Sequence, residues 1–208
     1  MIYGIRPTLG LAALTMAGTI GIGAVLGIIA GYFRGIAEEI IMRIVDVMLS
    51  FPSQIMVFAV VALLGVSVQN VIIANVFIKW AWYARMIRTG VMQYRDKNFV
   101  QFSRCVGMPE RFILFRHLLP SITSDLAVLA SLDIGWAIIN ISTLSFLGLG
   151  VQAPTPEWGA MLNEAKEVLT SNPTQMLAPG IAIVALVCCF NLLGDAMRDV
   201  LDPKEVAK

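Results

Sequence analysis

Charged residues are scarce in this sequence. Asp, Glu, Lys and Arg make up 14% of its 208 residues, whereas hydrophobic residues make up 58%. A soluble domain carries charge at about one quarter of its positions. The mean hydropathy is +0.79, and the few charges are bunched between apolar stretches. Because water cannot solvate so much apolar surface, the composition argues against a soluble protein and indicates one embedded in a membrane.

Histidine and cysteine are nearly absent. His117 is the sole histidine, and Cys105, Cys188 and Cys189 are the three cysteines. No CxxC or His-rich spacing accompanies them, which argues against a metal site or a disulfide framework. We interpret the cysteines as small apolar fillers. The net charge of +1 gives no support for a nucleic-acid partner, which would require a concentrated basic excess.

Long apolar stretches are abundant, and a helix needs about 20 apolar residues to cross the hydrocarbon core of a bilayer. The first stretch is rich in glycine, which permits close helix contact in lipid, so we expect it to pack tightly against a neighbour. Pro52 predicts a kink in the second stretch and is a candidate for lining a gate. The expected spans are residues 9–31, 40–64, 70–92, 123–147 and 177–197.

Basic residues concentrate between the third and fourth expected spans, which places this loop in the cytoplasm by the positive-inside rule. Counting outward from it puts residues 201–208 in a cytoplasmic tail and the start of the chain outside. No basic stretch precedes the first apolar run, so no cleavable signal is visible. We therefore expect that a first helix is missing from this sequence. The basic residues are Arg85, Arg88, Arg95, Lys97, Arg104, Arg111 and Arg116.

Residues 93–120 are expected to form a cytoplasmic coupling loop, a rigid element that receives force from a separate ATPase. Gly107-Met108-Pro109 predicts a break between two short helices. An ordinary amphipathic segment at the membrane surface is the alternative. The apolar stripe of the expected helices contains Phe99, Phe102, Val106, Ile113 and Leu114.

This loop resembles the "EAA" loop of ABC importer permeases. The resemblance rests on Gln101-Phe102-Ser103, followed after three residues by Gly107 and after nine more by His117-Leu118-Leu119-Pro120. The sequence departs from the family pattern at Glu-Ala-Ala, which is Gln-Phe-Ser here, and at the isoleucine that His117 replaces. The ATPase-coupling residues that the resemblance implies are Gln101, Phe102, Ser103, Arg104, Gly107, Met108, Pro109, His117, Leu119 and Pro120.

Two further stretches, residues 144–159 and 190–203, are similar to the second, C-type permease of dipeptide, oligopeptide and nickel importers. Together with residues 80–88 they are similar to the nickel and metallophore branch. The resemblance covers essentially the whole chain and implies an all-α, type-1 ABC transmembrane bundle over residues 1–200. It implies nickel or a metal–metallophore complex as cargo, with a dipeptide or oligopeptide as the alternative. Family members usually begin with an additional helix, in agreement with the missing one.

Polar residues inside spans are costly and are candidates for the transport pathway by default. Lys79, Asp133 and Asn140 lie in the third and fourth expected spans. Asp133 and Asn140 are seven residues apart, about two helical turns, so they share one helix face. Structural hydrogen bonds between spans are the alternative, and Lys79 is a candidate to pair with an acidic residue of a partner subunit.

The resemblance implies a bacterial cytoplasmic-membrane assembly with a sister permease, two cytoplasmic ATPase subunits and an extracytoplasmic binding protein. The chain has no GxxxxGK[ST] motif, so ATP and Mg are expected on the ATPase subunits and no cofactor on this chain. An intramembrane enzyme would need a nucleophile with its base or a HExxH motif, and neither is visible. A lone channel would not require the coupling loop.

Overall fold

Helices make up all the regular structure in the computed structural model, which describes residues 1–201. The predicted all-α bundle is therefore confirmed. The predicted tail, residues 201–208, lies outside the described residues apart from Leu201. The elements are η1 (Ile2–Gly4), α1 (Ile5–Phe33), α2 (Ile36–Ser50), α3 (Ser53–Leu64), α4 (Val68–Arg95), α5 (Asn98–Cys105), α6 (Glu110–Ile113), the π-helical turn η2 (Leu114–Leu118), α7 (Leu119–Phe146), α8 (Trp158–Glu167) and α9 (Thr174–Leu201).

The glycine-rich α1 packs directly against α4. Gly23, Gly27 and Gly31 repeat every four residues and present one bare face of the helix. A Cβ atom at Gly27 would lie 2.7 Å from the carbonyl oxygen of Ala84, and one at Gly31 would lie 2.9 Å from that of Arg88. The backbones meet where a side chain would not fit, which confirms the prediction of tight packing.

Pro52 breaks the second expected span completely. α2 and α3 meet at an angle of 91°, whereas the sequence predicts a kink in one helix. Proline has no N–H to donate, and its ring would clash with the carbonyl group of Met48 in a continuous helix. Pro52 therefore stands just before α3, and residues 40–64 form two helices instead of one.

α4 is the central helix of the bundle and packs against α1, α2, α3 and α7. It covers the expected span 70–92 and continues for a few residues at both ends. It contains Lys79 near its middle and, further along, Arg85 and Arg88. Within residues 1–201, three helices are long and apolar enough to cross a membrane, and the bent α2–α3 pair would make a fourth. α4 is not among them, because its charged and amide side chains, Lys79, Arg85 and Arg88 included, make it less apolar.

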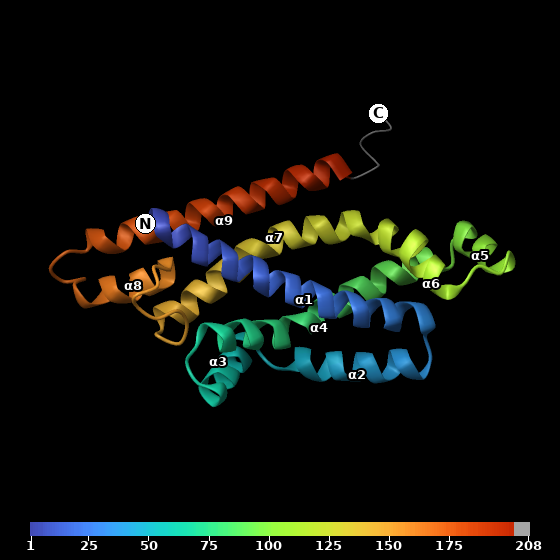
Figure 1. Cartoon of the computed structure of the whole chain (residues 1–208), viewed down its shortest axis with the longest axis horizontal. Helices are drawn as coiled ribbons and strands as arrows, with labels where there is room; N and C mark the ends of the chain where they lie inside the picture. The colour runs from blue at the N-terminus through green and yellow to red at the C-terminus, as the bar shows by residue number, and fades with distance from the viewer. Residues whose placement is uncertain (202–208) are drawn as a thin grey trace.

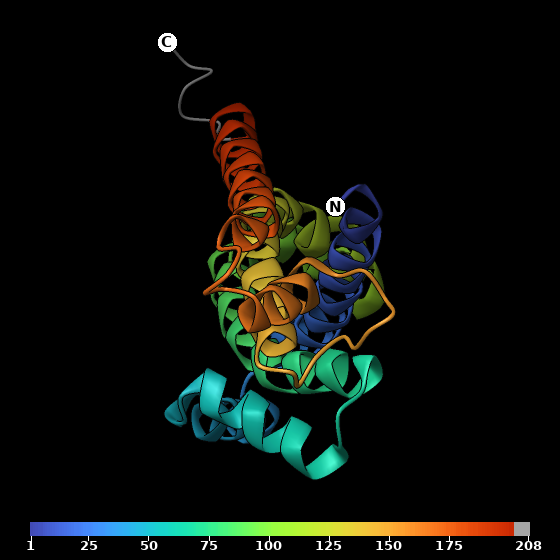
Figure 2. The same ribbon diagram turned by 90° about the vertical axis from the view of Figure 1, so that its left-hand side faces the viewer.

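The two ends of the bundle carry different elements (Figure 1). α5, α6 and the last turns of α9 lie at one end, together with the turn between α1 and α2. α8 and the start of the chain lie at the other end. This separation agrees with the predicted sidedness, because the basic loop and the C-terminal part of the chain share an end. α9 and the α2–α3 pair project from opposite sides of the bundle (Figure 2).

Candidate functional site

The turn after α5 has the geometry that the sequence predicts at Gly107. Its φ of +80° lies in the left-handed region, which glycine adopts without steric cost. The N–H of Met108 donates to the carbonyl of Ser103 at 3.0 Å, and the N–H of Gly107 donates to that of Arg104 at 2.9 Å. This pair of bonds is a Schellman motif, which satisfies the last carbonyl groups of α5. Pro109 comes next and directly precedes the first residue of α6.

The second half of the expected loop is not a short helix. α6, η2 and α7 run on as one helix from Glu110 to Phe146, 37 residues long. Pro120 cannot donate to the carbonyl of Arg116, and the wider π turn before it accommodates the ring without ending the helix. Two short helices were therefore the wrong prediction: one short helix, α5, is joined to the foot of a long one.

His117 holds α5 against the foot of that long helix. Its Nε2 atom lies 3.1 Å from Ser103 Oγ, and Ser103 Oγ also donates to the carbonyl of Phe99 at 2.9 Å. Since a hydroxyl group has one proton to donate, Nε2–H is the donor to Ser103. The His117 ring also packs edge-on against Phe99 and Phe112, with centroid distances of 5.8 and 5.5 Å.

An apolar groove of about 590 Å³ lies between α5 and η2. Phe102 is 70% exposed and Val106 59% exposed, although both lie at the polar end of the bundle. Apolar side chains gathered at a water-facing end indicate a surface that another protein covers. The groove is lined by Asn98, Phe99, Phe102, Ser103, Val106, Met108, Phe112 and His117.

The groove contains only some of the expected coupling residues. Phe102, Ser103, Met108 and His117 line it, and Gly107 forms the adjoining turn. The other expected residues are outside it: the Gln101 side chain donates to the carbonyl of Asp96 at 3.1 Å, Arg104 faces Tyr32, Pro109 precedes α6, and Leu119 and Pro120 lie in α7.

Phe112 also lines the groove but is absent from the predicted set. Phe112 and His117 are five residues apart, a spacing that places both on one helix face where the helix contains a π turn. The sequence does not reveal that turn.

Lys79 and Asp133 form an ion pair inside the bundle. Lys79 Nζ lies 3.2 Å from Asp133 Oδ1, and the two side chains are 15% and 17% exposed. The ammonium group also lies 3.5 Å from the centroid of the Trp136 ring and 5.3 Å from that of Trp82. The acidic partner of Lys79 is thus in its own chain, on α7, and not in another subunit as considered from the sequence.

Tyr83 is a further neighbour of Asp133, and its hydroxyl interacts with the Asp133 carboxylate. The hydroxyl and the second carboxylate oxygen, Oδ2, are both buried, and neither makes any other hydrogen bond in residues 1–201. Asn140 lies two turns further along α7, where its amide donates to the carbonyl of Trp136 at 3.1 Å. Its Oδ1 atom is also buried without a partner in that range. Pro52 belongs to neither group, because it stands at the break between α2 and α3.

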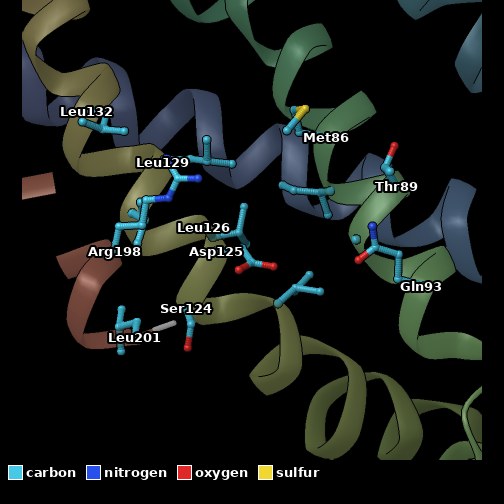
Figure 3. A pocket seen from close by; sticks show the side chains of 14 residues that line it. Met86, Thr89, Gln93, Ser124, Asp125, Leu126, Leu129, Leu132, Arg198 and Leu201 are labelled. Atoms are coloured by element: carbon cyan, nitrogen blue, oxygen red, sulfur yellow. The ribbon is translucent and has the colours of Figure 1, made fainter. Parts of the chain in front are cut away.

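A hollow of about 460 Å³ opens between α4, α7 and α9, in the half of the bundle nearer α5 (Figure 3). Its polar lining includes Gln93 from α4, Asp125 from α7 and Arg198 from α9. Gln93 lies fourteen residues after Lys79, close to four helical turns, and Leu126, which also lines the hollow, lies seven residues before Asp133, close to two turns. The hollow therefore follows the helix faces that carry the ion pair. Sequence reasoning missed these lining residues, although the spacing was visible.

Glu157 is another residue that the sequence analysis missed. Its side chain is fully buried at the opposite end of the bundle. Ser142 donates to Oε1 and the N–H of Ala160 donates to Oε2, each at 3.0 Å. The Thr8 hydroxyl, which donates to the carbonyl of Gly4 at 2.9 Å, lies 3.4 Å from Oε1. The carboxylate thus joins α1, α7 and the start of α8. Its neighbour Trp158 is 5% exposed, so its indole ring is packed inside the protein.

No group of three or more His, Cys, Asp or Glu side chains in residues 1–201 is arranged to hold a metal ion.

Known proteins resemble this chain in sequence and in fold. The family model described as "Binding-protein-dependent transport system inner membrane component" matches residues 23–206. The Staphylococcus aureus (strain Mu50) metal-staphylopine import system permease protein CntC is 44% identical over 208 residues, which is 100% of this chain and 72% of that protein. The Escherichia coli (strain K12) nickel transport system permease protein NikC is 41% identical over 203 residues, 98% of this chain and 73% of that protein.

A third relative has a different cargo in its name. The dipeptide transport system permease protein DppC of Alkalihalophilus pseudofirmus is 40% identical over 204 residues, 98% of this chain and 67% of that protein. Among solved structures, the MetNI methionine ABC transporter in an inward-facing conformation matches with a TM-score of 0.75 at 19% identity. That match covers 97% of this chain and 95% of the other, and it supports the fold.

Proposed function

Because this chain belongs to the binding-protein-dependent transport system inner membrane components, we propose that it pairs with a sister permease to move a metal complex across the membrane. The chain is an ABC importer permease and a multi-pass protein of the bacterial cytoplasmic membrane. The family implies association with ATPase and substrate-binding proteins. The proposal adds a sister permease, two ATPase subunits that bind ATP and Mg, and the class of cargo.

The exposed apolar groove beside α5 is the observation that supports coupling to an ATPase. The groove lies at the end of the bundle that the positive-inside rule places in the cytoplasm. A surface of the ATPase that fills it would push on α5 and, through the contact between Ser103 and His117, on the foot of the long helix. Closure of the two ATPase subunits then rotates this helix as a rigid body.

The pathway follows the faces of α4 and α7 that hold the ion pair. Lys79 and Asp133 neutralise each other at the middle of the bundle, and the hollow that contains Gln93 and Asp125 continues toward the cytoplasmic end. Ionisable residues are costly inside a membrane, and where they occur they commonly mark a transport pathway. Asn140 extends the same face of α7 outward, and the break at Pro52 is the candidate gate.

The cargo is the least constrained part of this proposal. The three relatives named above are 44%, 41% and 40% identical to this chain. Their names give three different cargoes, which are a metal complex, nickel and a dipeptide. We favour nickel or a metal–metallophore complex, on the resemblance of residues 80–88 and the 44% identity to CntC. A dipeptide or oligopeptide is the alternative that the comparison with DppC supports.

Uptake measurements in cells that lack the gene separate these cargoes. Radiolabelled nickel, free and chelated, and a labelled dipeptide are supplied in parallel, and the gene is restored on a plasmid as the control. We expect high-affinity uptake of metal to fall to the background level while dipeptide uptake remains. Loss of dipeptide uptake with normal metal uptake would assign the chain to the peptide importers instead.

A further inference from the structure

Tyr32, Arg95 and Arg104 meet where α1, α4 and α5 come together, and we call these three residues the tyrosine–arginine cluster. Tyr32 is 3% exposed. The guanidinium carbon of Arg104 lies 5.0 Å from the centroid of the Tyr32 ring, and that of Arg95 lies 5.9 Å from it. Two cations therefore share one aromatic ring.

Neither arginine has an acidic partner in residues 1–201. The ion pairs in that range are Arg34–Asp96, Lys79–Asp133, Arg85–Asp46 and Arg88–Glu38. Arg95 Nε and Nη1 and Arg104 Nε are buried without a hydrogen-bond acceptor there, and so is the hydroxyl of Tyr32. Buried donors without acceptors are rare in folded proteins, because each one loses its hydrogen bonds to water without replacing them.

The charges around the cluster leave it positive. Burial lowers the pKa of Arg95, and the nearby cations Arg34 and Arg104 lower it further. Asp96 and Glu38 act in the opposite direction but more weakly, and each is already paired with another arginine. An anion placed here would gain two guanidinium partners without displacing an existing ion pair.

The position of the cluster indicates where such an anion comes from. Tyr32 is the penultimate residue of α1 and Arg95 the last residue of α4, so the cluster lies where these two helices leave the membrane. This is the level of the lipid headgroups on the cytoplasmic side, where anionic headgroups attract arginine. The planar guanidinium group also matches two oxygens of a phosphate at once.

We propose that the tyrosine–arginine cluster binds the phosphate of an anionic lipid headgroup and so fixes the orientation of α5 against α1 and α4. Arg95 belongs to α4 and Arg104 to α5, so one phosphate joins the membrane-embedded helix to the coupling element. The chemistry alone would also suit free inorganic phosphate. The depth of the cluster favours the lipid.

The test uses the complete importer, purified with its partner subunits and placed in nanodiscs of neutral phosphatidylcholine. Phosphatidylglycerol is added in steps, and bound lipid is counted by native mass spectrometry. We expect saturable binding of phosphatidylglycerol that falls at least tenfold when Arg95→Gln and Arg104→Gln are combined. Arg43→Gln is the matched control, because Arg43 is an exposed arginine of α2 and makes no ion pair within residues 1–201.

Each other outcome overturns the proposal in a different way. Displacement of the lipid by millimolar phosphate would assign the cluster to a free anion. Unchanged lipid binding in the double variant, with loss of ATPase subunits from the complex, would assign it to a carboxylate of the ATPase. If the double variant does not assemble, Arg95→Lys with Arg104→Lys keeps both charges and loses the planar fork, and lipid binding equal to that of the unaltered protein would count against the proposal.

Discussion

Removing one member of the Lys79–Asp133 ion pair should destabilise the folded protein. Lys79→Met leaves the Asp133 carboxylate charged and largely buried, and removal of one partner from such a pair costs about 3–5 kcal/mol. We expect a lower midpoint of thermal unfolding in detergent, with partial recovery in the double variant Lys79→Met with Asp133→Asn. Uptake should stay low in the double variant if the pair also serves the pathway.

Uptake at the original level in that double variant would assign the pair to structure alone. Lys166→Met is a suitable control, because Lys166 is exposed on α8 and forms no ion pair in residues 1–201.

Glu157 gives a second prediction at this scale. Glu157→Gln places an amide NH2 where the carboxylate now accepts from Ser142 or from the N–H of Ala160, so one donor loses its acceptor. We expect a destabilisation of about 1–3 kcal/mol, measured as a lower unfolding midpoint of the purified complex. The exposed Glu164 of the same helix provides the control Glu164→Gln, for which no change is expected. Equal midpoints for the two variants would show that the buried carboxylate contributes nothing to stability.

A substitution at Gly107 tests the role of the turn after α5. Gly107→Val forces a β-branched residue to a φ of +80°, a conformation that L side chains rarely adopt. No neighbouring atom would lie within 4 Å of the new Cβ, so the effect comes from the backbone and not from crowding. We expect normal membrane insertion but loss of ATPase co-purification and of uptake.

Two measurements check this prediction: pull-down of the ATPase subunits from detergent, and whole-cell uptake. Gly107→Asn is the matched control, because asparagine tolerates the left-handed region better than a β-branched residue. If Gly107→Val retains ATPase binding and uptake in full, α5 and its turn are not the coupling element.

The elements show which parts of a membrane fold are predictable from sequence. The apolar length of the stretches gave the positions of α1, α7 and α9 within a few residues, because the bilayer sets that length. It could not show that Pro52 separates two helices by 91° instead of bending one. Nor could it show the π turn at Leu114–Leu118, which depends on how Pro120 is accommodated in three dimensions.

The site was predictable to a similar extent. Motif spacing placed Gly107 at a turn and Phe102 beside it, since both depend on local sequence. The bond between Ser103 and His117, the partner of Lys79 and the buried carboxylate of Glu157 all join residues far apart in the chain. Such pairings follow from packing, and neither periodicity nor charge pattern determines them.

The molecule as a whole has a predicted orientation that chemical labelling can test. Cys105, Cys188 and Cys189 are exposed and must first be replaced by serine or alanine. On that background, a cysteine at Lys97 should react with a membrane-impermeant maleimide only in inside-out vesicles, because the basic loop lies in the cytoplasm. A cysteine at Gln152 should react only in intact, right-side-out cells. Reversed labelling would invert the arrangement.

The unbroken helix from Glu110 to Phe146 connects the two ends of the bundle. α7 packs closely on α9 near Leu132, because Gly194 leaves so little room that a Cβ there would lie 2.6 Å from the Leu132 side chain. We expect the long helix to pivot at this close approach. At 1.5 Å per residue, the arm from Leu132 to Glu110 is about 33 Å long and the arm from Leu132 to Phe146 about 21 Å. A displacement of about 3 Å at Glu110 would then move Phe146 by about 2 Å in the opposite direction, which would narrow one side of the bundle while it widens the other.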